Sequence, residues 1–236
     1  MIPKIIHYCW FGGNPLSDLA KKCIASWKKY CPDYEIIEWN ESNFDISGNN
    51  FVKQAYENKK FAFVADYVRL YAMYNHGGIY MDTDVEATRP LDEFLVHKAF
   101  SGFERGVFVP TGIMASEQGF PLFKELLEYY TDRNFVKDDG SLDTITNSVI
   151  ITNTLKEYGF VANDKFQIIE DFALYPTDYF CPLNGATGKL TVTKNTATIH
   201  WFSNTWASPA KRFASKIARI VKRIFGEDCL EKLKKL

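Results

Sequence analysis

The stretch FAFVADYVRLYAMYNHGGIYMDTDVE, residues 61–86, decides the fold that this sequence predicts. Apolar residues at helical spacing run up to the pair Gly77-Gly78, a common signal for a helix end, so we predict a helix over Lys59 to His76. The apolar run Ile79-Tyr80-Met81 then indicates a short buried strand that ends at the triplet Asp82-Thr83-Asp84. We therefore expect the acidic triplet at the carboxyl end of a strand, where open α/β sheets bind their ligands.

The residues before this stretch predict a βαβ unit. Residues 2–9 have the apolar character of a buried strand, which runs into a loop with the pair Gly12-Gly13. Ser17 to Tyr30 has helical spacing with Ser17 as a possible cap, and Tyr34 to Trp39 reads as a second short strand. The order strand, helix, strand is the start of a layered α/β domain. The glycine pair indicates a loop where a ligand can approach the backbone closely.

The residues after this stretch alternate between predicted strands and helices. Residues 99–115 resemble a hairpin or strand pair, and both Pro121 to Tyr130 and Thr144 to Tyr158 are predicted helices. Strands and loops alternate over residues 166–175 and 190–201. This order of elements predicts an α/β fold.

The composition is that of an ordinary globular protein. Hydrophobic residues make up 46% and charged residues 24% of the chain, which argues against a disordered protein. Aromatic residues reach 16%, which indicates an aromatic core more than a stacking surface for bases or sugars. The net charge of −1 shows no nucleic-acid-binding character, so we expect no nucleic-acid partner.

The cysteines and the hydrophobic runs favour a cytoplasmic protein. The 5 cysteines include no CxxC pair, so we expect free thiols rather than a zinc site or a disulfide framework. The sequence has neither an apolar run of about 18 residues nor the pattern of a signal peptide. We therefore expect no membrane-spanning helix and a protein that folds and works in the cytoplasm.

Charge is distributed unevenly along the chain. Residues 207–236 hold nine basic and three acidic residues, a net charge of +6, against −7 for residues 1–206. We therefore predict a main domain over residues 1–206 and a basic helical tail over residues 207–236. Residues 209–225 of the tail predict an amphipathic helix, and its apolar side holds Phe213, Ile217, Ile220, Val221, Ile224 and Phe225. Such a helix fits an anionic membrane surface and a packed position on the acidic domain equally well.

The triplet Asp82-Thr83-Asp84 has the residue types and the spacing of a metal site. Residues i and i+2 of a strand share one face, so both carboxylates can turn toward one ion. Carboxylates suit hard cations such as Mg²⁺ or Mn²⁺, and such an ion neutralises the charge of a leaving diphosphate. The alternative is a solvated acidic turn, which the preceding helix and apolar strand disfavour. Glu86 shares the same face if the strand continues past the turn.

Three other side chains near this stretch are candidates for ligand binding. Asp66 and Arg69 lie three residues apart in the predicted helix and therefore on one face. They form either an ion pair of structural use only, or a site where Asp66 accepts from sugar hydroxyls and Arg69 donates to sugar or phosphate oxygens. Trp10, which follows the first strand, is either a core residue or a stacking surface for a planar base.

The segment HWFSNTW, residues 200–206, is the last candidate. His200 and Ser203 can complete a metal or diphosphate shell, and Trp206 can donate its indole N–H to a phosphate oxygen. The alternative is an aromatic strand and turn that closes the core. The chain has only 4 histidines, and His200 lies among polar groups and two tryptophans, which favours the ligand role.

These segments, in this order, resemble glycosyltransferase family 32 and the glucosyltransferase domain of the large clostridial toxins. The matching segments are IPKIIHYCWFGG, SWKKYCPDYEIIEWN, FAFVADYVRLYAMYNHGGIYMDTDVE and HWFSNTW, within residues 2–206. The segment TNSVIIT, residues 146–152, is similar to a TGPxxxT stretch of the family, with Asn147-Ser148 in place of Gly-Pro. The resemblance implies a GT-A type nucleotide-diphospho-sugar transferase fold, an α/β structure whose mixed, mostly parallel central sheet is flanked by helices.

The resemblance also implies which residues bind the donor. The residues implied for base stacking and for the donor sugar are Trp10, Asp66 and Arg69. The residues implied for the ribose and the metal are Asp82 and Asp84. The residues implied for a further metal ligand and a clamp on the leaving group are His200, Ser203 and Trp206. In the toxin-like proteins a carboxylate occupies the position of His200, and a histidine there also binds Mn²⁺.

The activity that the resemblance implies is that of a metal-dependent hexosyltransferase with Mn²⁺ or Mg²⁺ as cofactor. It would move a hexose from a nucleotide-sugar, with UDP-hexose favoured, to a hydroxyl of a glycan or lipid-linked acceptor, with retention of anomeric configuration. Such an enzyme of surface polysaccharide synthesis can contact the inner membrane face through residues 209–225. The alternatives are a non-enzymatic nucleotide-sugar or glycan-binding module and a metal-dependent phosphatase or nucleotidyltransferase.

Overall fold

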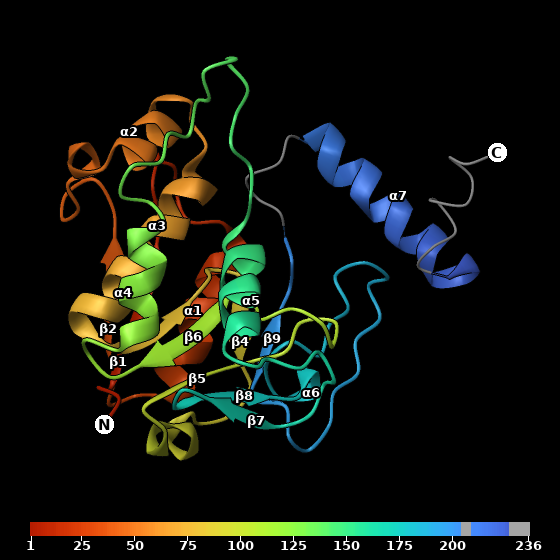
Figure 1. Cartoon of the computed structure of the whole chain (residues 1–236). Coiled ribbons are helices and arrows are strands. Elements are labelled where there is room, and N and C mark those ends of the chain that lie inside the picture. The colour runs from red at the N-terminus through yellow and green to blue at the C-terminus, as the bar shows by residue number, and fades with distance from the viewer. Residues whose placement is uncertain (204–208, 227–236) are drawn as a thin grey trace.

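A seven-stranded sheet in the order β2-β1-β3-β6-β5-β8-β7 lies at the centre of the computed structural model (Figure 1). The structure describes residues 1–203 and 209–226. The strands of this sheet are β1 (Ile5–Cys9), β2 (Glu35–Trp39), β3 (Gly78–Met81), β5 (Ala99–Gly102), β6 (Ile113–Ser116), β7 (Gln167–Ile169) and β8 (Phe172–Tyr175). A separate two-stranded ladder consists of β4 (Val85–Ala87) and β9 (Thr198–His200).

Helices surround the sheet. The α-helices are α1 (Asp18–Tyr30), α2 (Asn50–Glu57), α3 (Phe61–His76), α4 (Pro121–Glu128), α5 (Asn147–Glu157), α6 (Thr177–Phe180) and α7 (Pro209–Phe225). Two 3-10 helices are η1 (Ile46–Gly48) and η2 (Asp92–Val96). The predicted α/β architecture, with a central sheet flanked by helices, is therefore confirmed.

The central sheet is mixed. Among the described residues, its parallel pairings are β1 with β2, β1 with β3 and β5 with β8, and its antiparallel pairings are β3 with β6, β5 with β6 and β7 with β8. The mixed sheet is as predicted, although parallel pairings make up half of it rather than most. The reason is local, because the loops between β5 and β6 and between β7 and β8 are shorter than the dozen or more residues that a parallel crossover needs. Glu170 and Asp171, between β7 and β8, both have positive φ, as in a two-residue hairpin turn.

The βαβ unit predicted at the start of the chain is confirmed. β1 and β2 pair in parallel with Ile5 opposite Glu35, and α1 connects them. Ser17 caps α1, since its side-chain oxygen accepts a hydrogen bond from the Ala20 backbone N–H at 3.1 Å. The cap satisfies one of the free N–H groups at the start of the helix and fixes where the helix begins.

The turn from α3 into β3 requires its two glycines. Gly77 and Gly78 have φ values of 68° and 95°. A Cβ atom at Gly77 would lie 2.6 Å from the Gln118 backbone nitrogen, and one at Gly78 would lie 2.8 Å from the Ile5 carbonyl oxygen. A side chain at either position would therefore collide with the neighbouring strands. The glycine pair lets β3 enter the sheet between β1 and β6 directly after the helix.

Two hydrophobic cores lie on the two faces of the sheet. One contains side chains from α2, α3, α4 and α5, and the other contains side chains from α1, η2 and α6 (Figure 1). β3 is buried on both sides, with Tyr80 in the first core and Ile79 and Met81 in the second. Most of the largest fully buried side chains are aromatic, as the composition indicates: Trp27, Tyr80, Tyr130, Phe51, Phe94, Phe100, Phe103, Phe123, Phe135, Phe172 and Phe180.

The C-terminal part of the chain contains the predicted helix. α7 spans Pro209–Phe225 and projects from the side of the sheet domain (Figure 1). The predicted domain boundary between residues 206 and 207 and the cysteine Cys229 lie outside the described residues. The described cysteines are free and buried, as expected: Cys9, Cys23, Cys31 and Cys181. None of the described helices has both the length and the apolar character needed to cross a membrane.

Candidate active site at the end of strand β3

The acidic triplet forms the turn between β3 and β4. The Asp82 N–H donates to the Gly112 carbonyl at 2.8 Å, which continues the pairing of β3 with β6 past the last strand residue. The Val85 N–H donates to the Asp82 carbonyl at 2.9 Å, which closes the turn. Asp82 and Asp84 thus lie at the carboxyl end of a central strand, where the sequence predicts them.

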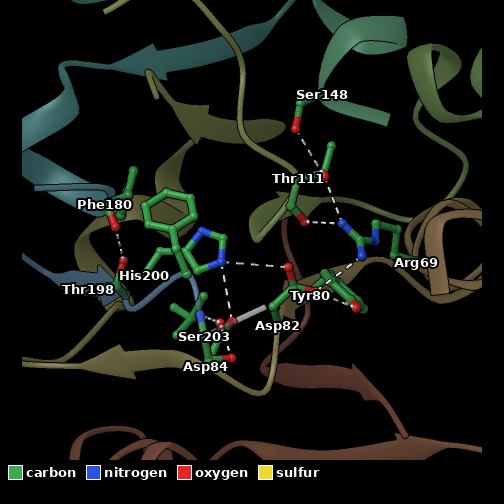
Figure 2. A network of polar contacts seen from close by, with 12 residues as sticks. Arg69, Tyr80, Asp82, Asp84, Thr111, Ser148, Phe180, Thr198, His200 and Ser203 are labelled. Carbon is green, nitrogen blue, oxygen red and sulfur yellow. Dashed lines mark hydrogen bonds and ion pairs between the residues drawn. The ribbon is translucent and has the colours of Figure 1, made fainter. Parts of the chain in front are cut away.

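The ladder of β4 and β9 brings the C-terminal segment to this turn. Val85 lies opposite His200 in the ladder, and the Trp201 N–H donates to the Asp84 carbonyl at 2.9 Å. As a result, His200 Nε2 lies 3.2 Å from Asp84 Oδ1 and 4.0 Å from Asp82 Oδ2 (Figure 2). One possible ligand atom from each of Asp82, Asp84 and His200 lies within 4.8 Å of the other two. We call these three side chains the Asp-Asp-His cluster.

Ser203 fixes the carboxylate of Asp84. Its backbone N–H and its hydroxyl both donate to Asp84 Oδ2, at 2.7 and 2.8 Å, so that Oδ1 faces His200. Burial alone would raise the pKa of the Asp84 carboxyl, but His200 and the bonds from Ser203 hold it below its usual range. Burial would likewise lower the pKa of His200, but Asp84 raises it well above its ordinary value. The two groups therefore stabilise each other's charged form.

The donor set of the cluster fits a divalent cation. Two carboxylates and one imidazole that has released its proton are ligand types that Mn²⁺ accepts, and the carboxylates also suit Mg²⁺. The spacing of the three ligand atoms allows a single ion to contact all of them. Hydrogen bonds that orient a ligating carboxylate, such as those from Ser203 to Asp84, are typical of protein metal sites.

Arg69 connects the cluster to α3. Its buried guanidinium donates through Nη1 to the carbonyl and the hydroxyl of Thr111, at 3.0 and 2.7 Å (Figure 2). Nη2 lies 3.4 Å from Asp66 Oδ1 and 3.2 Å from Asp82 Oδ1, and Nε donates to the Ala65 carbonyl at 3.2 Å. The N–H groups of Nε and Nη1 are therefore hydrogen-bonded within the protein, and Nη2 forms ion pairs with the two carboxylates. This geometry indicates that Arg69 orients the carboxylates of Asp66 and Asp82.

Asp66 and Tyr80 complete this network. The Tyr80 hydroxyl donates to Asp82 Oδ1 at 2.9 Å, and the Tyr80 ring centroid lies 4.9 Å from the guanidinium carbon of Arg69. Burial raises the pKa of the Asp66 carboxyl to about 6, although Arg69 acts in the opposite direction. Asp66 is therefore a buried carboxylate beside the cluster, and it is mostly ionised at neutral pH.

Several residues of the site are absent from the sequence-based candidates. Thr111 and Gly112 precede β6, and the Ser148 hydroxyl lies 3.5 Å from that of Thr111. A Cβ atom at Gly112 would lie 2.7 Å from His200 Cε1 and 3.3 Å from Asp82 Oδ2, so this glycine leaves room for the cluster. No periodic pattern marks the short run before β6, and only the small size of its residues could have drawn attention to it.

The segment TNSVIIT packs against the site despite its departure from the family pattern. Asn147 begins α5, and its side-chain amide donates to the Asp66 carbonyl at 2.6 Å. Together with the contact of Ser148 to Thr111, this bond supports the backbone that carries the two carboxylates. The segment thus contacts Asp66 and Thr111 of the site.

Of the two tryptophan candidates, Trp10 lies within the described residues. Trp10 directly follows β1, the parallel neighbour of β3, and is half-buried with its indole N–H donating to the Asn14 carbonyl at 2.6 Å. This position is beside the strand end that carries the triplet, and the base-stacking role stays a prediction. Trp206 lies outside the described residues.

Glu86 belongs to a different part of the structure from the cluster. It lies on β4, and its Oε2 atom accepts from the Trp201 indole N–H at 2.9 Å and from Lys22 Nζ at 2.8 Å. These two bonds hold the carboxylate away from His200. The strand does not continue past the turn, because β3 ends at Met81 and Glu86 lies on β4 of the separate ladder, where it attaches α1 and Trp201 to β4.

The matches to known proteins described here are all to glycosyltransferases. Residues 17–101 match the family described as the glycosyltransferase sugar-binding region containing the DXD motif. Inositol phosphoceramide mannosyltransferase 3 of Schizosaccharomyces pombe is 28% identical over 134 residues, which are 53% of this chain and 36% of the relative. An uncharacterized glycosyltransferase, L373, of Acanthamoeba polyphaga mimivirus is 25% identical over 197 residues, which are 78% of this chain and 74% of the relative.

Among solved structures, the PaToxG glycosyltransferase has a TM-score of 0.47 at 20% identity and covers 66% of this chain and 69% of its own. The galactosyltransferase LgtC has a TM-score of 0.43 at 13% identity, with 90% and 93% covered. The chain spans about a third of the length of the first two curated relatives, 36% and 34%. The resemblance expected from the sequence is confirmed by the family match over residues 17–101.

Proposed function

Because residues 17–101 match the DXD-containing sugar-binding region of glycosyltransferases, we propose that this chain is a metal-dependent retaining glycosyltransferase of the GT-A type. It moves a hexose from a nucleotide-sugar, with UDP-hexose as the favoured donor, to a hydroxyl of a glycan or glycolipid acceptor in surface polysaccharide synthesis. The observation that carries the proposal is the Asp-Asp-His cluster at the end of β3. Residues 1–206 form the catalytic domain in this proposal, and residues 207–236 form a basic tail.

The cluster holds the cation in this proposal. A bound Mn²⁺ or Mg²⁺ supplies charge neutralisation for the diphosphate leaving group. Asp82, Asp84 and His200 are the ligands, and Ser203 keeps Asp84 in place through its two hydrogen bonds. Trp206, at the end of the same segment, is the proposed clamp on the leaving group.

The residues around the cluster position the donor. Trp10 stacks on the base at the end of β1, and Asp82 accepts from the ribose. Asp66 accepts hydrogen bonds from the donor sugar with its buried carboxylate. Arg69 donates to sugar or phosphate oxygens of the donor, and its ion pairs with Asp66 and Asp82 orient the two carboxylates.

Retention of anomeric configuration is proposed without a covalent intermediate. The leaving diphosphate itself accepts the proton of the acceptor hydroxyl on the same face of the sugar. Determination of the product's anomeric configuration by NMR, with mass spectrometry of the quenched enzyme, checks this step. An inverted product, or a glycosyl adduct on a carboxylate, contradicts it.

The acceptor is proposed to lie at or near a membrane. A curated relative carries the name inositol phosphoceramide mannosyltransferase, which names a lipid substrate. α7 presents three isoleucines on an exposed surface together with basic residues of the tail. These features support contact with an anionic membrane surface, where a lipid-linked acceptor is found.

A panel of nucleotide-sugars with Mn²⁺ tests the proposed function. The true donor at ten times its Kd is expected to stabilise the protein by about 1.4 kcal/mol, seen as a rise in melting temperature, and to be hydrolysed slowly. Binding of a donor without hydrolysis or transfer would indicate a non-enzymatic binding module. Release of phosphate from simple esters, without a response to any nucleotide-sugar, would indicate a phosphatase.

A further inference from the structure

A cavity lies beside the Asp-Asp-His cluster, between the sheet domain and α7. It has a volume of about 240 Å³, and its lining includes Glu104, Phe202, Ser215 and Arg219. One water molecule needs only about 10–15 Å³ of such space, so the cavity has room for a ligand much larger than a water. The residues that line this cavity are different from those that we assign to the metal and the donor.

Phe202 separates the cavity from the cluster. Its ring stacks on the His200 imidazole with the ring centroids 4.0 Å apart. On the other side, a Cβ atom at Gly185 would lie 3.3 Å from the same ring, so the ring is held between the two residues. Phe202 has a φ of 49°, in the left-handed region that a bulky residue rarely adopts. A backbone held in this conformation between His200 and Ser203 indicates a functional constraint on this wall.

Glu104 contributes a carboxylate to the lining of the cavity. It follows β5, and backbone hydrogen bonds with Phe108 fix the turn that carries it, at 2.7 and 3.1 Å. Burial raises the pKa of Glu104, and the charges of His200 and Asp82 also act on this group. Glu104 lines the same cavity as Phe202, whose ring stacks on His200.

α7 forms the outer wall of the cavity. Arg219 Nε donates to the Gly185 carbonyl and Arg219 Nη2 donates to the Phe202 carbonyl, both at 2.9 Å. Ser215 lies one turn earlier on α7 and also lines the cavity. The helix is therefore attached to the backbone of Phe202 and to that of Gly185, which packs against the Phe202 ring.

We infer that this cavity binds the sugar acceptor, with a hydroxyl of one sugar ring donating to Glu104 and α7 closing the site. The inference rests on the proposed function. A carboxylate acceptor, a guanidinium and a hydroxyl around a small cavity are the groups that recognise a polyhydroxylated ring. The cavity adjoins His200, so an acceptor in it lies next to the site where the donor is cleaved.

The test compares transfer to a sugar with hydrolysis of the donor. The donor is the one that the nucleotide-sugar panel identifies, and the acceptor probes are methyl glycosides of glucose, galactose and mannose. The variants Glu104→Gln and Arg219→Ala are expected to reduce the ratio of transfer to hydrolysis by at least about tenfold, mainly through a higher acceptor KM, because each loses a charge-assisted hydrogen bond. The matched controls Glu157→Gln and Arg223→Ala change exposed residues and are expected to keep the wild-type ratio.

Two results of the transfer assay overturn the inference while leaving the proposed function intact. One is a ratio within twofold of wild type in both Glu104→Gln and Arg219→Ala. The other is a wild-type enzyme that hydrolyses the donor but glycosylates none of the methyl glycosides. A change in the Mn²⁺ concentration for half-maximal hydrolysis in Glu104→Gln would assign this residue to the metal site and would also overturn the inference. A wild-type protein that neither binds nor hydrolyses any nucleotide-sugar overturns the proposed function, and the inference with it.

Discussion

At the residue scale, Arg69 organises the carboxylates of the site, because it is hydrogen-bonded to Thr111 and its own helix while its Nη2 forms ion pairs with Asp66 and Asp82. The spacing of Asp66 and Arg69 in the sequence predicts their common helix face. The sequence does not predict the use of Arg69, since Thr111 and Asp82 reach it only through the arrangement of β3 and β6. A planar, five-donor group is needed at this point, and a lysine cannot reproduce it.

Arg69→Lys is therefore expected to lower donor hydrolysis by about a hundredfold or more, since the carboxylates that position donor and metal lose their common partner. The measurement is the rate of donor hydrolysis together with the melting temperature, which separates loss of activity from loss of folding. Hydrolysis within a few-fold of wild type in a folded Arg69→Lys protein would show that this network is dispensable.

His7 gives a stability prediction that is independent of the site. The Trp39 indole N–H donates to His7 Nδ1 at 3.1 Å, so His7 is neutral and its Nε2–H donates to the Gly77 carbonyl at 2.9 Å. Burial lowers the pKa of His7 from 6.5 to about 4. Between these values the unfolded chain binds a proton that the folded chain does not, so stability is lost as the pH falls from 6.5 to 4.

The expected contribution of His7 to this loss is about 3 kcal/mol. Denaturant unfolding at several pH values, for wild type and for His7→Gln, measures it. The variant is expected to be less stable at neutral pH and to lose less stability on acidification. If the free energy of unfolding falls equally in wild type and His7→Gln on acidification, the prediction is contradicted.

At the scale of elements, the parts of the site that follow local rules are the parts that the sequence predicts. The helix α3, its glycine stop and the strand β3 each follow from periodicity and glycine geometry over a few residues. The ladder of β4 with β9 does not, because Val85 and His200 are far apart in the sequence and no local pattern pairs them. His200 can therefore be predicted only from the composition of its segment and from the family resemblance. Gly112 and Glu104 have no local sequence pattern that would identify them as site residues.

A substitution at Gly112 tests how closely the strand ends pack around the Asp-Asp-His cluster. In Gly112→Ala the added Cβ would lie 2.7 Å from His200 Cε1, so the imidazole must move away from the two carboxylates. We expect Mn²⁺ affinity to fall by about ten- to a hundredfold with the fold retained, because the backbone of Gly112 has no positive φ. Mn²⁺ titration by calorimetry measures it, with Gly48→Ala as the control. Equal affinity in both variants would remove His200 from the metal site.

At the scale of the whole molecule, α7 has one side attached to the sheet domain and another exposed. Arg219 holds the helix to the carbonyls of Gly185 and Phe202. Ile217, Ile220 and Ile224 are 48%, 59% and 68% exposed. The two interpretations of the tail, packed on the domain or placed on a membrane, are therefore compatible with each other. A membrane surface that covers the isoleucines would also lie near the cavity that we assign to the acceptor.

Flotation with vesicles that contain phosphatidylglycerol tests the membrane contact. The double variant Ile220→Asp, Ile224→Asp is expected to reduce the bound fraction by at least about tenfold, because the loss of each buried isoleucine removes about 1.5–3 kcal/mol. Ile168→Asp, at an exposed isoleucine of β7, is the matched control and should float like wild type. Equal flotation of the double variant and the control, or none by wild type, would leave α7 as a packed helix only.

The central claim is that the Asp-Asp-His cluster holds the cation needed for donor cleavage, and the Mn²⁺ dependence of donor hydrolysis in Asp84→Asn tests it most directly. Wild-type hydrolysis should stop with a chelator and return with Mn²⁺. The variant should be slower by about a hundred- to a thousandfold at any Mn²⁺ concentration, because one fixed electrostatic stabiliser is worth about 3–4 kcal/mol in the transition state. Undiminished turnover in Asp84→Asn, with an unchanged Mn²⁺ dependence, would contradict the claim.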